Sequence, residues 1–131
     1  MSDNKATILC IDDDSQMLAL LEQWLTSAGY LVATTTTCAQ ALQLTNTFRP
    51  DLIIQDVLMP DMSGYDCCRK LRENKALAMT PIVFLTGLAT LENRVQSSIS
   101  GGNDFIAKPF NLHELSVKAI TLLLKNQLDL P

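Results

Sequence analysis

Acidic side chains stand at the ends of two short apolar segments of this chain. Asp12, Asp13 and Asp14 come directly after one segment, and Asp56 comes just after another. Two carboxylates about 4 Å apart repel each other by about 4 kcal/mol at an effective dielectric constant near 20. A hard divalent cation removes that repulsion, and oxygen ligands suit Mg²⁺ or Mn²⁺. The pattern predicts a metal site at Asp12, Asp13 and Asp56. A solvated turn is the alternative for the first two, and a helix cap is favoured for Asp14.

A hydroxyl and a cation occupy comparable places further along the chain. Thr86 and Gly87 follow a third apolar segment, and Lys108 follows a fourth. A phosphoryl group on Asp56 would bring negative charge, which Lys108 can pair with and the Thr86 hydroxyl can hydrogen-bond. Aspartyl phosphate is a recognised form of covalent carboxylate chemistry. Taken singly, these are an ordinary strand-end threonine and an ordinary surface lysine, so it is their joint occurrence that predicts phosphoryl chemistry.

These side chains can meet only if the segments before them share one edge of a sheet. Near-continuous apolar runs are typical of parallel strands covered on both faces, and apolar residues three or four apart are typical of helices. The predicted strands are 6–11, 31–36, 52–54, 81–85 and 105–107. Three helices are predicted at 16–28, at 37 or 38 to 47, and at 63 or 64 to about 73. A fourth has Leu91, Val95 and Ile99 as its apolar stripe and ends at Gly101-Gly102. A fifth runs to about residue 127.

This alternation predicts an α/β fold with a doubly wound, five-stranded parallel sheet and five helices. The flavodoxin-like strand order 2-1-3-4-5 is the common solution at this size, and it gathers function at the carboxyl ends of the strands. The 131 residues predict one domain, 1–131, with its core at about 6–125. Ser15 is predicted to cap the first helix, Gly29 to end it, and Asn111 to cap the last.

Composition excludes several functional classes. The chain is 47% hydrophobic and 18% charged with a net charge of -4, so it lacks the basic excess of a nucleic-acid or membrane-surface protein. No apolar run approaches about 18 residues, and the N-terminus lacks a signal-peptide core, so a cytoplasmic location is expected. The third predicted helix carries basic residues that we interpret as a solvated face, and the cysteines are predicted to be reduced and structural. These are Arg69, Lys70, Arg72 and Lys75, and Cys10, Cys38, Cys67 and Cys68.

Over about residues 6–125 the sequence resembles the receiver domains of two-component signalling, the CheY-like superfamily. Residues 50–64, PDLIIQDVLMPDMSG, resemble the phosphoacceptor segment of that family, and this match is highly specific. The other matching segments are ILCIDDD at 8–14, PIVFLTG at 81–87 and GGNDFIAKPF at 101–110. The resemblance implies a signalling switch that a sensor histidine kinase or a phosphotransfer protein phosphorylates.

The resemblance also implies a role for each site residue. Asp56 would be the phosphoacceptor. Asp13 and Asp56 would bind Mg²⁺ directly, Asp12 would bind it through water, and the backbone carbonyl of Leu58 would complete the protein ligands. In the family the Lys-Pro peptide, here at Lys108, is typically cis.

The family's switch residues also have counterparts here. Lys108 would pair with the phosphoryl group or with Asp56, the Thr86 hydroxyl would hydrogen-bond the phosphoryl oxygen, and the Gly87 N–H would also contact it. Phe105 would then repack inward. Phe105 stands where the family often has Tyr, so any inward rotamer buries no hydroxyl, whereas an exposed Phe would mark an apolar partner surface. Gly87 replaces a common Ala or Ser.

Two leucines are expected to flank the phosphoryl site. Leu58 and Leu88 are predicted to restrict the attacking water, which would make the phosphoryl group long-lived. Gln55 is polar inside a buried strand and needs a hydrogen-bond partner.

The output surface is predicted at helix four, strand five and helix five. Helix four contains Ser97, Ser98 and Ser100, which are modest helix formers and make it a candidate for movement. Helix five carries one apolar stripe that would face the core, and a second that either widens the core face or binds a partner, including a second copy of the chain. The stripes are Leu112, Leu115, Ala119 and Leu122, and Val117, Ile120, Leu124 and Leu128.

Other readings remain beside the signalling switch. The chain is equally compatible with a piece of a transcription regulator or of a hybrid kinase. A phosphatase with an Asp nucleophile usually needs an acid where Leu58 stands, and a nucleotide-binding module usually needs a glycine-rich phosphate loop that this sequence lacks.

Overall fold

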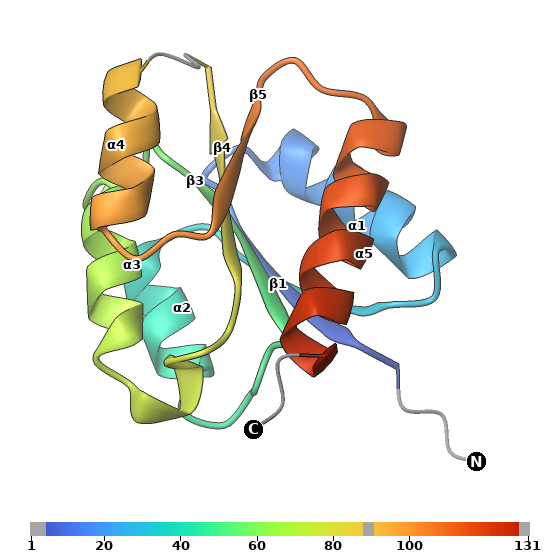
Figure 1. Ribbon diagram of the computed structural model, residues 1–131, viewed down its shortest axis with the longest axis horizontal. Coiled ribbons are helices and arrows are strands. Elements are labelled where there is room, and N and C mark those ends of the chain that lie inside the picture. The colour runs from blue at the N-terminus through green and yellow to red at the C-terminus, as the bar shows by residue number, and fades with distance from the viewer. Residues whose placement is uncertain (1–4, 88–90, 129–131) are drawn as a thin grey trace.

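Five parallel strands form one sheet with helices on both faces (Figure 1). The computed structural model describes residues 5–87 and 91–128. The strand order is β2-β1-β3-β4-β5, which confirms the predicted fold class and strand order. The strands are β1 Thr7–Ile11, β2 Leu31–Thr35, β3 Leu52–Asp56, β4 Ile82–Thr86 and β5 Asp104–Ala107. The helices are α1 Ser15–Ser27, α2 Cys38–Leu44, α3 Gly64–Arg72, α4 Leu91–Ile99 and α5 Leu112–Leu128, with a short 3₁₀ turn at Lys75–Leu77.

The central strands are hydrophobic because both of their faces are covered. Every residue of β3 and β4 is buried, whereas the edge strand β2 buries only its last residue. Both central strands extend further than predicted, so that Asp56 and Thr86 are the last residues of β3 and β4. Strand register pairs Asp56 with Leu85 and Thr86 with Ala107. The chemistry-bearing side chains therefore lie at one edge of the sheet.

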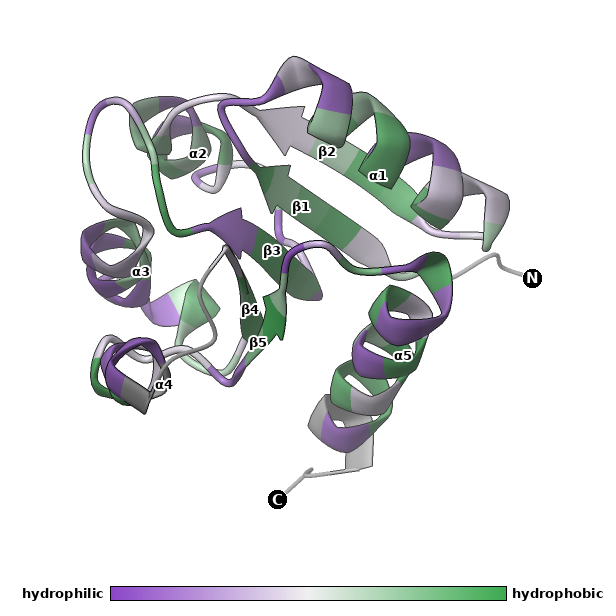
Figure 2. Cartoon of the chain, turned by 90° about the horizontal axis from the view of Figure 1, so that it is seen from above, coloured by the Kyte–Doolittle hydropathy of each residue, from purple (hydrophilic) through white to green (hydrophobic). Residues whose placement is uncertain are grey.

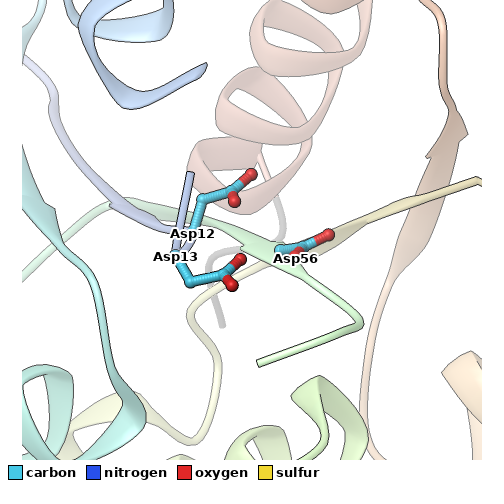
Figure 3. A group of neighbouring side chains, drawn as sticks. All are labelled: Asp12, Asp13 and Asp56. Carbon is cyan, nitrogen blue, oxygen red and sulfur yellow. The ribbon is translucent and has the colours of Figure 1, made fainter. Parts of the chain in front are cut away.

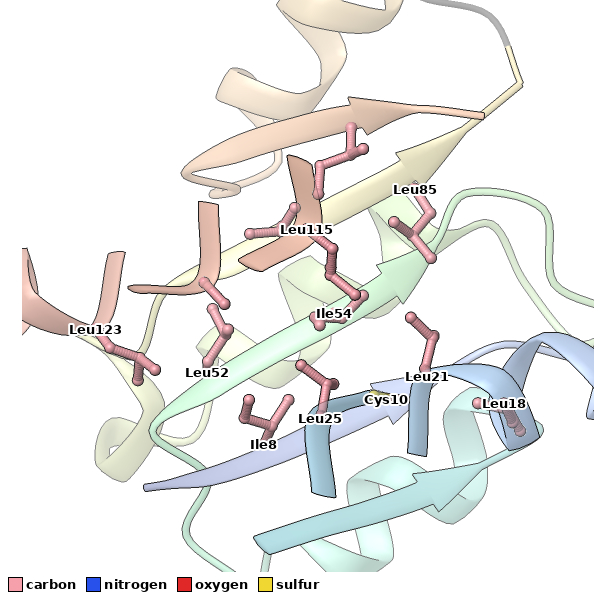
Figure 4. Packing of buried hydrophobic residues seen from close by; sticks show 13 residues of the cluster. Ile8, Cys10, Leu18, Leu21, Leu25, Leu52, Ile54, Leu85, Leu115 and Leu123 are labelled. Carbon is pink, nitrogen blue, oxygen red and sulfur yellow. The ribbon is translucent and has the colours of Figure 1, made fainter. Parts of the chain in front are cut away.

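Two apolar layers hold the sheet between the helices. Figure 2 shows α1 and α5 on one face and α2, α3 and α4 on the other. The first layer joins Ile8, Ile54 and Leu85 to α1 and α5 (Figure 4). The second joins Leu9, Ile53 and Phe84 to α2 and α3. Strand residues alternate between the two layers because successive side chains point to opposite faces of a sheet.

Helix ends follow the predicted chemistry with one correction. Asp14 caps α1, because its carboxylate accepts hydrogen bonds from the N–H groups of Gln16 and Met17. This confirms the capping role favoured for Asp14 and corrects the prediction that Ser15 is the cap. The side chain of Asn111 accepts from the Glu114 N–H at the start of α5, as predicted. Gly29 and Gly101 adopt φ values of 100° and 103° after α1 and α4, a conformation that side chains other than glycine rarely adopt.

The prediction that all four cysteines are reduced is wrong. Cys38 at the start of α2 and Cys67 in α3 form a disulfide with a Cα–Cα distance of 5.8 Å, while Cys10 and Cys68 are free and buried. A separation of 29 residues gives no local signal for this pair. The bond forms because α2 and α3 pack side by side on one face of the sheet, where both sulfurs lie in the second apolar layer.

The prediction of a solvated basic face on the third helix is wrong at one of its four positions, and Lys75 lies beyond α3 in the 3₁₀ turn. Arg69, Lys70 and Lys75 are exposed, but Arg72 is half-buried. Its guanidinium donates hydrogen bonds to the carbonyls of Leu77, Thr80 and Gly101 and to the side chain of Asn103. The planar guanidinium suits this task because it offers five donors in a fixed geometry.

The predicted apolar stripe of α4 does not face the core. Val95 and Ile99 are 45% and 66% exposed, whereas Ser97 is buried and its hydroxyl donates to the Asn93 carbonyl. The side chain of Leu91 is outside the described residues. Because the Ser97 hydroxyl bonds to the backbone of its own helix, Ser97 can be buried without a hydrogen-bond partner on the sheet.

Helix α5 matches its prediction in part. Leu115 and Ala119 are buried and Leu122 is half-buried, but Leu112 is 42% exposed, and Leu123 lies in the core instead. The second stripe faces outward rather than widening the core face. Its described members are Val117, Ile120 and Leu124, each about half exposed, while the side chain of Leu128 is not described.

Candidate functional site

Three carboxylates meet where β1 and β3 end. Asp56 closes β3, and Asp12 and Asp13 follow β1 directly, so the parallel register brings them to the same edge. Figure 3 shows the three side chains next to one another. One oxygen from each lies within 4.8 Å of the others, and the group could hold a metal ion. Asp12 and Asp56 are buried and Asp13 is exposed, which leaves the cluster open to solvent on one side.

Lys108 supplies the cation of the site. Its ammonium donates to Asp56 Oδ1 at 3.0 Å and lies 3.5 Å from Asp12 Oδ2. Burial alone would lower the pKa of Lys108, but the hydrogen bond to Asp56 and the charge of Asp12 raise the pKa above its ordinary value. The lysine therefore stays charged at neutral pH. The Lys108–Pro109 peptide is cis, as the resemblance implied.

One lysine does not neutralise three acids. Burial raises the pKa of Asp56 despite the hydrogen bond from Lys108, and burial raises the pKa of Asp12, with the neighbouring charges of Asp56 and Asp13 adding to it. The Asp12 Oδ2 atom is fully buried and accepts no hydrogen bond from the described residues, although Lys108 lies 3.5 Å away as an ion pair. A buried carboxylate oxygen that accepts no hydrogen bond, beside two more carboxylates, belongs to the donor set that a hard divalent cation prefers.

The other predicted site residues surround this cluster with one exception. A pocket at the strand ends is lined by the acids together with Leu58, Thr86, Gly87 and Lys108. Leu58 is 79% exposed at the rim, and Thr86 is buried. Phe105 does not line the pocket; it is half-buried and packs against the second apolar layer, so it is not the exposed aromatic of an apolar partner surface. Leu88 lies outside the described residues.

Two polar residues that the sequence patterns did not indicate lie on the helices beside the pocket. Asn93, in the first turn of α4, lines the pocket, and its side-chain oxygen accepts a hydrogen bond from the Tyr65 hydroxyl at 3.0 Å. Tyr65 belongs to α3, and its ring packs edge-on against Phe84 with the centroids 5.0 Å apart. The hydrogen bond spans two helices, so neither residue carries a signal in its own segment.

The loop that follows Asp56 is held by a third residue that the sequence patterns did not indicate, Asp61. The Asp61 carboxylate accepts hydrogen bonds from the N–H groups of Cys38 and Ala39 at the start of α2. Burial would raise the pKa of Asp61, but these hydrogen bonds outweigh it and lower the pKa below its ordinary value. Gln55, by contrast, is fully buried in β3 and has no hydrogen-bond partner for its side chain among the described residues, so the expectation of a partner is not met.

A flavodoxin-like sheet with an acid cluster, a lysine and a threonine at its carboxyl edge is the architecture of a phosphorylation-type signalling module. The chain belongs to the response regulator receiver domain family, whose model matches residues 8–120. It is therefore a receiver domain of two-component signal transduction.

Relatives of known name agree with this assignment. The transcriptional regulatory protein GltR of Pseudomonas aeruginosa is 35% identical over 127 residues, which cover 97% of this chain and 52% of GltR. A crystal structure of a CheY-like receiver domain protein from Methanospirillum hungatei is 30% identical with a TM-score of 0.88, covering 95% of this chain and 98% of that one. A two-component response regulator from Clostridium difficile has a TM-score of 0.85 at 28% identity, covering 91% and 96%. The chain spans about half the length of the curated relatives it matches.

No described helix combines the length and the apolar character that a membrane span requires.

Proposed function

We propose that this receiver domain is a phosphoacceptor switch in which Asp56 takes a phosphoryl group from a sensor histidine kinase or a phosphotransfer protein. The observation that carries the proposal is the Asp56 carboxylate, which is buried, paired with Lys108 at 3.0 Å and grouped with two further acids. A carboxylate oxygen of Asp56 attacks phosphorus as the bond to the donor nitrogen breaks. Lys108 remains charged and balances the added negative charge, and the Thr86 hydroxyl donates to a phosphoryl oxygen.

The same acids are proposed to hold Mg²⁺ or Mn²⁺. Asp13 and Asp56 would bind the ion directly, Asp12 would bind it through water, and the Leu58 backbone carbonyl would complete the protein ligands. The Asp12 Oδ2 atom, which accepts no hydrogen bond from the described residues, and the clustered carboxylates support this donor set. When bound, the ion neutralises charge that develops on the transferring phosphoryl group.

The output is proposed to run through α4, β5 and α5. Thr86 ends β4 beside Ala107 of β5, so movement of its hydroxyl toward the phosphoryl group, with the Gly87 N–H as a further contact and Phe105 repacking inward, would pass directly to this face. The outward apolar residues of α4 and α5 support a partner surface, including a homodimer. The homodimer is tested by measuring the mass of the protein in solution with and without beryllofluoride and Mg²⁺. A mass that stays that of the monomer would rule out the homodimer.

The biological setting is a proposal as well. Several relatives are transcriptional regulators about twice as long as this chain, which supports a place in a two-component pathway in the cytoplasm. We propose that this domain itself binds neither nucleic acid nor membrane, because its net charge is -4 and its basic residues do not gather at the pocket. We propose residues 1–131 as a single receiver domain, whether it acts alone or within a regulator or a hybrid kinase.

A signalling role is favoured over turnover catalysis. An Asp-nucleophile phosphatase usually has a second acid two residues after the nucleophile, and here Leu58 stands there with its side chain at the pocket rim. No described residue near Asp56 replaces that acid, because Asp12 and Asp13 belong to the carboxylate cluster itself. The domain would then assist only its own phosphorylation and dephosphorylation.

Incubation with acetyl phosphate and Mg²⁺, followed by intact mass spectrometry, tests the proposal. The wild type should gain one phosphoryl group, and Asp56→Asn should gain none. Asp66→Asn is the matched control, because Asp66 is an exposed acid of α3 whose partner is Arg69, away from the pocket. Undiminished phosphorylation of Asp56→Asn, or none in the wild type, would refute the assignment.

A further inference from the structure

The disulfide between Cys38 and Cys67 joins two helices that flank the acidic edge. Cys38 is the first residue of α2, and Cys67 lies in the first turn of α3. Both residues are fully buried in the second apolar layer. We call this bond the α2–α3 staple. It fixes the start of one helix to the start of the other at the end of the sheet where Asp56 lies.

Cys38 also holds the loop of residues 57–63, which runs from Asp56 to α3. Its backbone N–H donates to Asp61 Oδ1 at 3.2 Å, and the next N–H, of Ala39, donates to Asp61 Oδ2 at 3.1 Å. A carboxylate at a helix N-terminus is favoured because it satisfies free N–H groups and the positive end of the helix dipole. Cys38 is therefore connected to α3 through its sulfur and to loop 57–63 through its backbone N–H.

The far end of the loop is fixed just as closely. The Gly64 N–H donates to the Val57 carbonyl at 2.7 Å, and a Cβ added at Gly64 would collide with the Asp56 carbonyl. The first turn of α3, which carries Cys67, thus presses directly on the backbone of Asp56. A shift of α2 relative to α3 would displace Asp61, the loop and its Leu58 carbonyl together.

We propose that the α2–α3 staple is a redox-controlled element that sets the metal affinity and phosphorylation rate of this domain. This inference rests on the proposed phosphoacceptor function. With the disulfide formed, loop 57–63 is held in the arrangement seen here. With the disulfide reduced, the start of α2 separates more easily from α3, and the loop presents the Leu58 carbonyl less often in place.

The exchange needs a reductant of the dithiol class. One thiolate of the dithiol attacks a sulfur of the staple and breaks the S–S bond, which gives a mixed disulfide and a cysteine thiolate. The second thiol then displaces the other cysteine. Two electrons pass to the cysteines, each cysteine sulfur takes up one proton, and the dithiol becomes a cyclic disulfide.

Three features suit the bond to regulation. Disulfides in the cytosol are uncommon and are usually transient or redox-sensing. Helix α2 has only seven residues, so local opening of this short element can expose the buried sulfurs. The neighbouring Cys68 is free, and burial raises the pKa of its thiol, so Cys68 stays protonated and competes little for the exchange.

The test compares oxidised and reduced wild type after removal of all redox reagents. Isothermal titration with Mg²⁺ and the rate of Asp56 phosphorylation by acetyl phosphate are measured on both forms. Couplings between sites typically correspond to about 5–150-fold, and we expect the oxidised form to bind Mg²⁺ about fivefold more tightly and to react correspondingly faster. Cys38→Ala should behave like the reduced form under both conditions, whereas Cys68→Ala should keep the full redox response.

Each contrary result is decisive. Equal Mg²⁺ affinity and equal rates of Asp56 phosphorylation in the two redox forms would overturn the proposed redox control. The proposed phosphoacceptor function would remain intact. Failure of Cys38 and Cys67 to become protected from alkylation after oxidation would also overturn it. Unfolding of the reduced form by circular dichroism would make the bond structural rather than regulatory. Absence of phosphorylation in both forms would instead refute the proposed function.

Discussion

The two sides of the pocket are built differently. The chemistry side comprises Asp12, Asp13, Asp56 and loop 57–63, and it is tied down by a disulfide, an ion pair and backbone hydrogen bonds. The switch side comprises Thr86, α4 and β5. Helix α3 buries four of its residues, whereas the described side chains of α4 include a single buried one, Ser97. The chemistry side is held by a disulfide and by ion pairs of buried acids. On the switch side, the described side-chain hydrogen bonds of α4 are neutral, and Asp104 of β5 forms an ion pair with Lys118 of α5 at 2.7 Å.

This difference suits a switch. Catalytic and metal-binding groups work when their geometry is fixed in advance, whereas an element that reports a state must exchange one set of contacts for another at low cost. The Tyr65 hydroxyl bond to Asn93 can be exchanged in this way, because a neutral hydrogen bond contributes only about 0.5–1.5 kcal/mol. Substitutions on the two sides should therefore differ in kind as well as in size.

The largest contrast is expected between two glycines. Gly64→Ala places a methyl group against the Asp56 carbonyl, whereas a methyl group at Gly87 meets no atom of the described residues beyond its chain neighbours within 4 Å. Overpacking against backbone costs about 1–3 kcal/mol, and we expect the upper end for Gly64→Ala together with loss of Mg²⁺ binding. Gly87→Ala should change the free energy of unfolding by less than about 0.5 kcal/mol. Urea denaturation measures both, and equal stabilities would show that the chemistry side is not tightly packed.

The sequence predicted the sheet and the acidic edge because both depend on local patterns. Buried strands such as β3 are apolar throughout, and the acids follow them directly, so strand order and convergence come from general rules of α/β topology. The disulfide, the Asp61 cap on α2 and the half-buried guanidinium of Arg72 depend on which segments become neighbours. The burial of Ser97 was not predicted either. Its hydroxyl bonds to the backbone of its own helix, so this polar side chain takes the buried position where an apolar one was expected.

Charge on the chemistry side gives the next prediction. In the metal-free protein, Asp12→Asn should raise the free energy of unfolding by about 1–2 kcal/mol, because it removes a buried charge that lies beside two further acids, while Lys108 keeps Asp56 as its partner. The sign reverses with Mg²⁺ present, since the variant loses the carboxylate that would hold the ion through water. The pKa of Asp12 is raised in the folded state, so its destabilising effect appears as pH rises through that pKa. The advantage of the variant should therefore shrink on acidification.

Urea denaturation with EDTA and with Mg²⁺, each at neutral and acidic pH, makes this measurement. Asp66→Asn is the control for removal of one negative charge, because both Asp66 and its partner Arg69 are exposed, and it should change stability little. A destabilised Asp12→Asn protein in EDTA would contradict the expectation.

The pocket rim gives a kinetic contrast. Leu58→Asn should accelerate phosphate release from phosphorylated Asp56 about tenfold, or about 1.4 kcal/mol in activation free energy, because an amide can orient water where the leucine restricts it. Leu58 is 79% exposed, so little stability should be lost. The time course of phosphate release measures the lifetime, and Met79→Asn is a control at a residue that is 74% exposed and outside the pocket lining. Unchanged or slower release from Leu58→Asn would contradict the prediction.

The smallest effect is expected on the switch side. Tyr65→Phe removes the hydroxyl that binds Asn93 but keeps the ring against Phe84, so stability should fall by about 0.5–1.5 kcal/mol. Because that bond holds the first turn of α4 in the arrangement seen here, its loss should favour the phosphorylated conformation. Affinity for beryllofluoride in Mg²⁺ should then rise about threefold, within the range that a fraction of this bond energy can supply.

Tyr30→Phe is the matched control, because Tyr30 packs against the first apolar layer on the other face of the sheet. It makes the same chemical change without touching α4, so beryllofluoride affinity should stay constant. A Tyr65→Phe protein with unchanged or weaker affinity would mean that the hydroxyl bond to Asn93 does not restrain the switch. The two sides of the pocket would then differ in packing but not in their part in signalling.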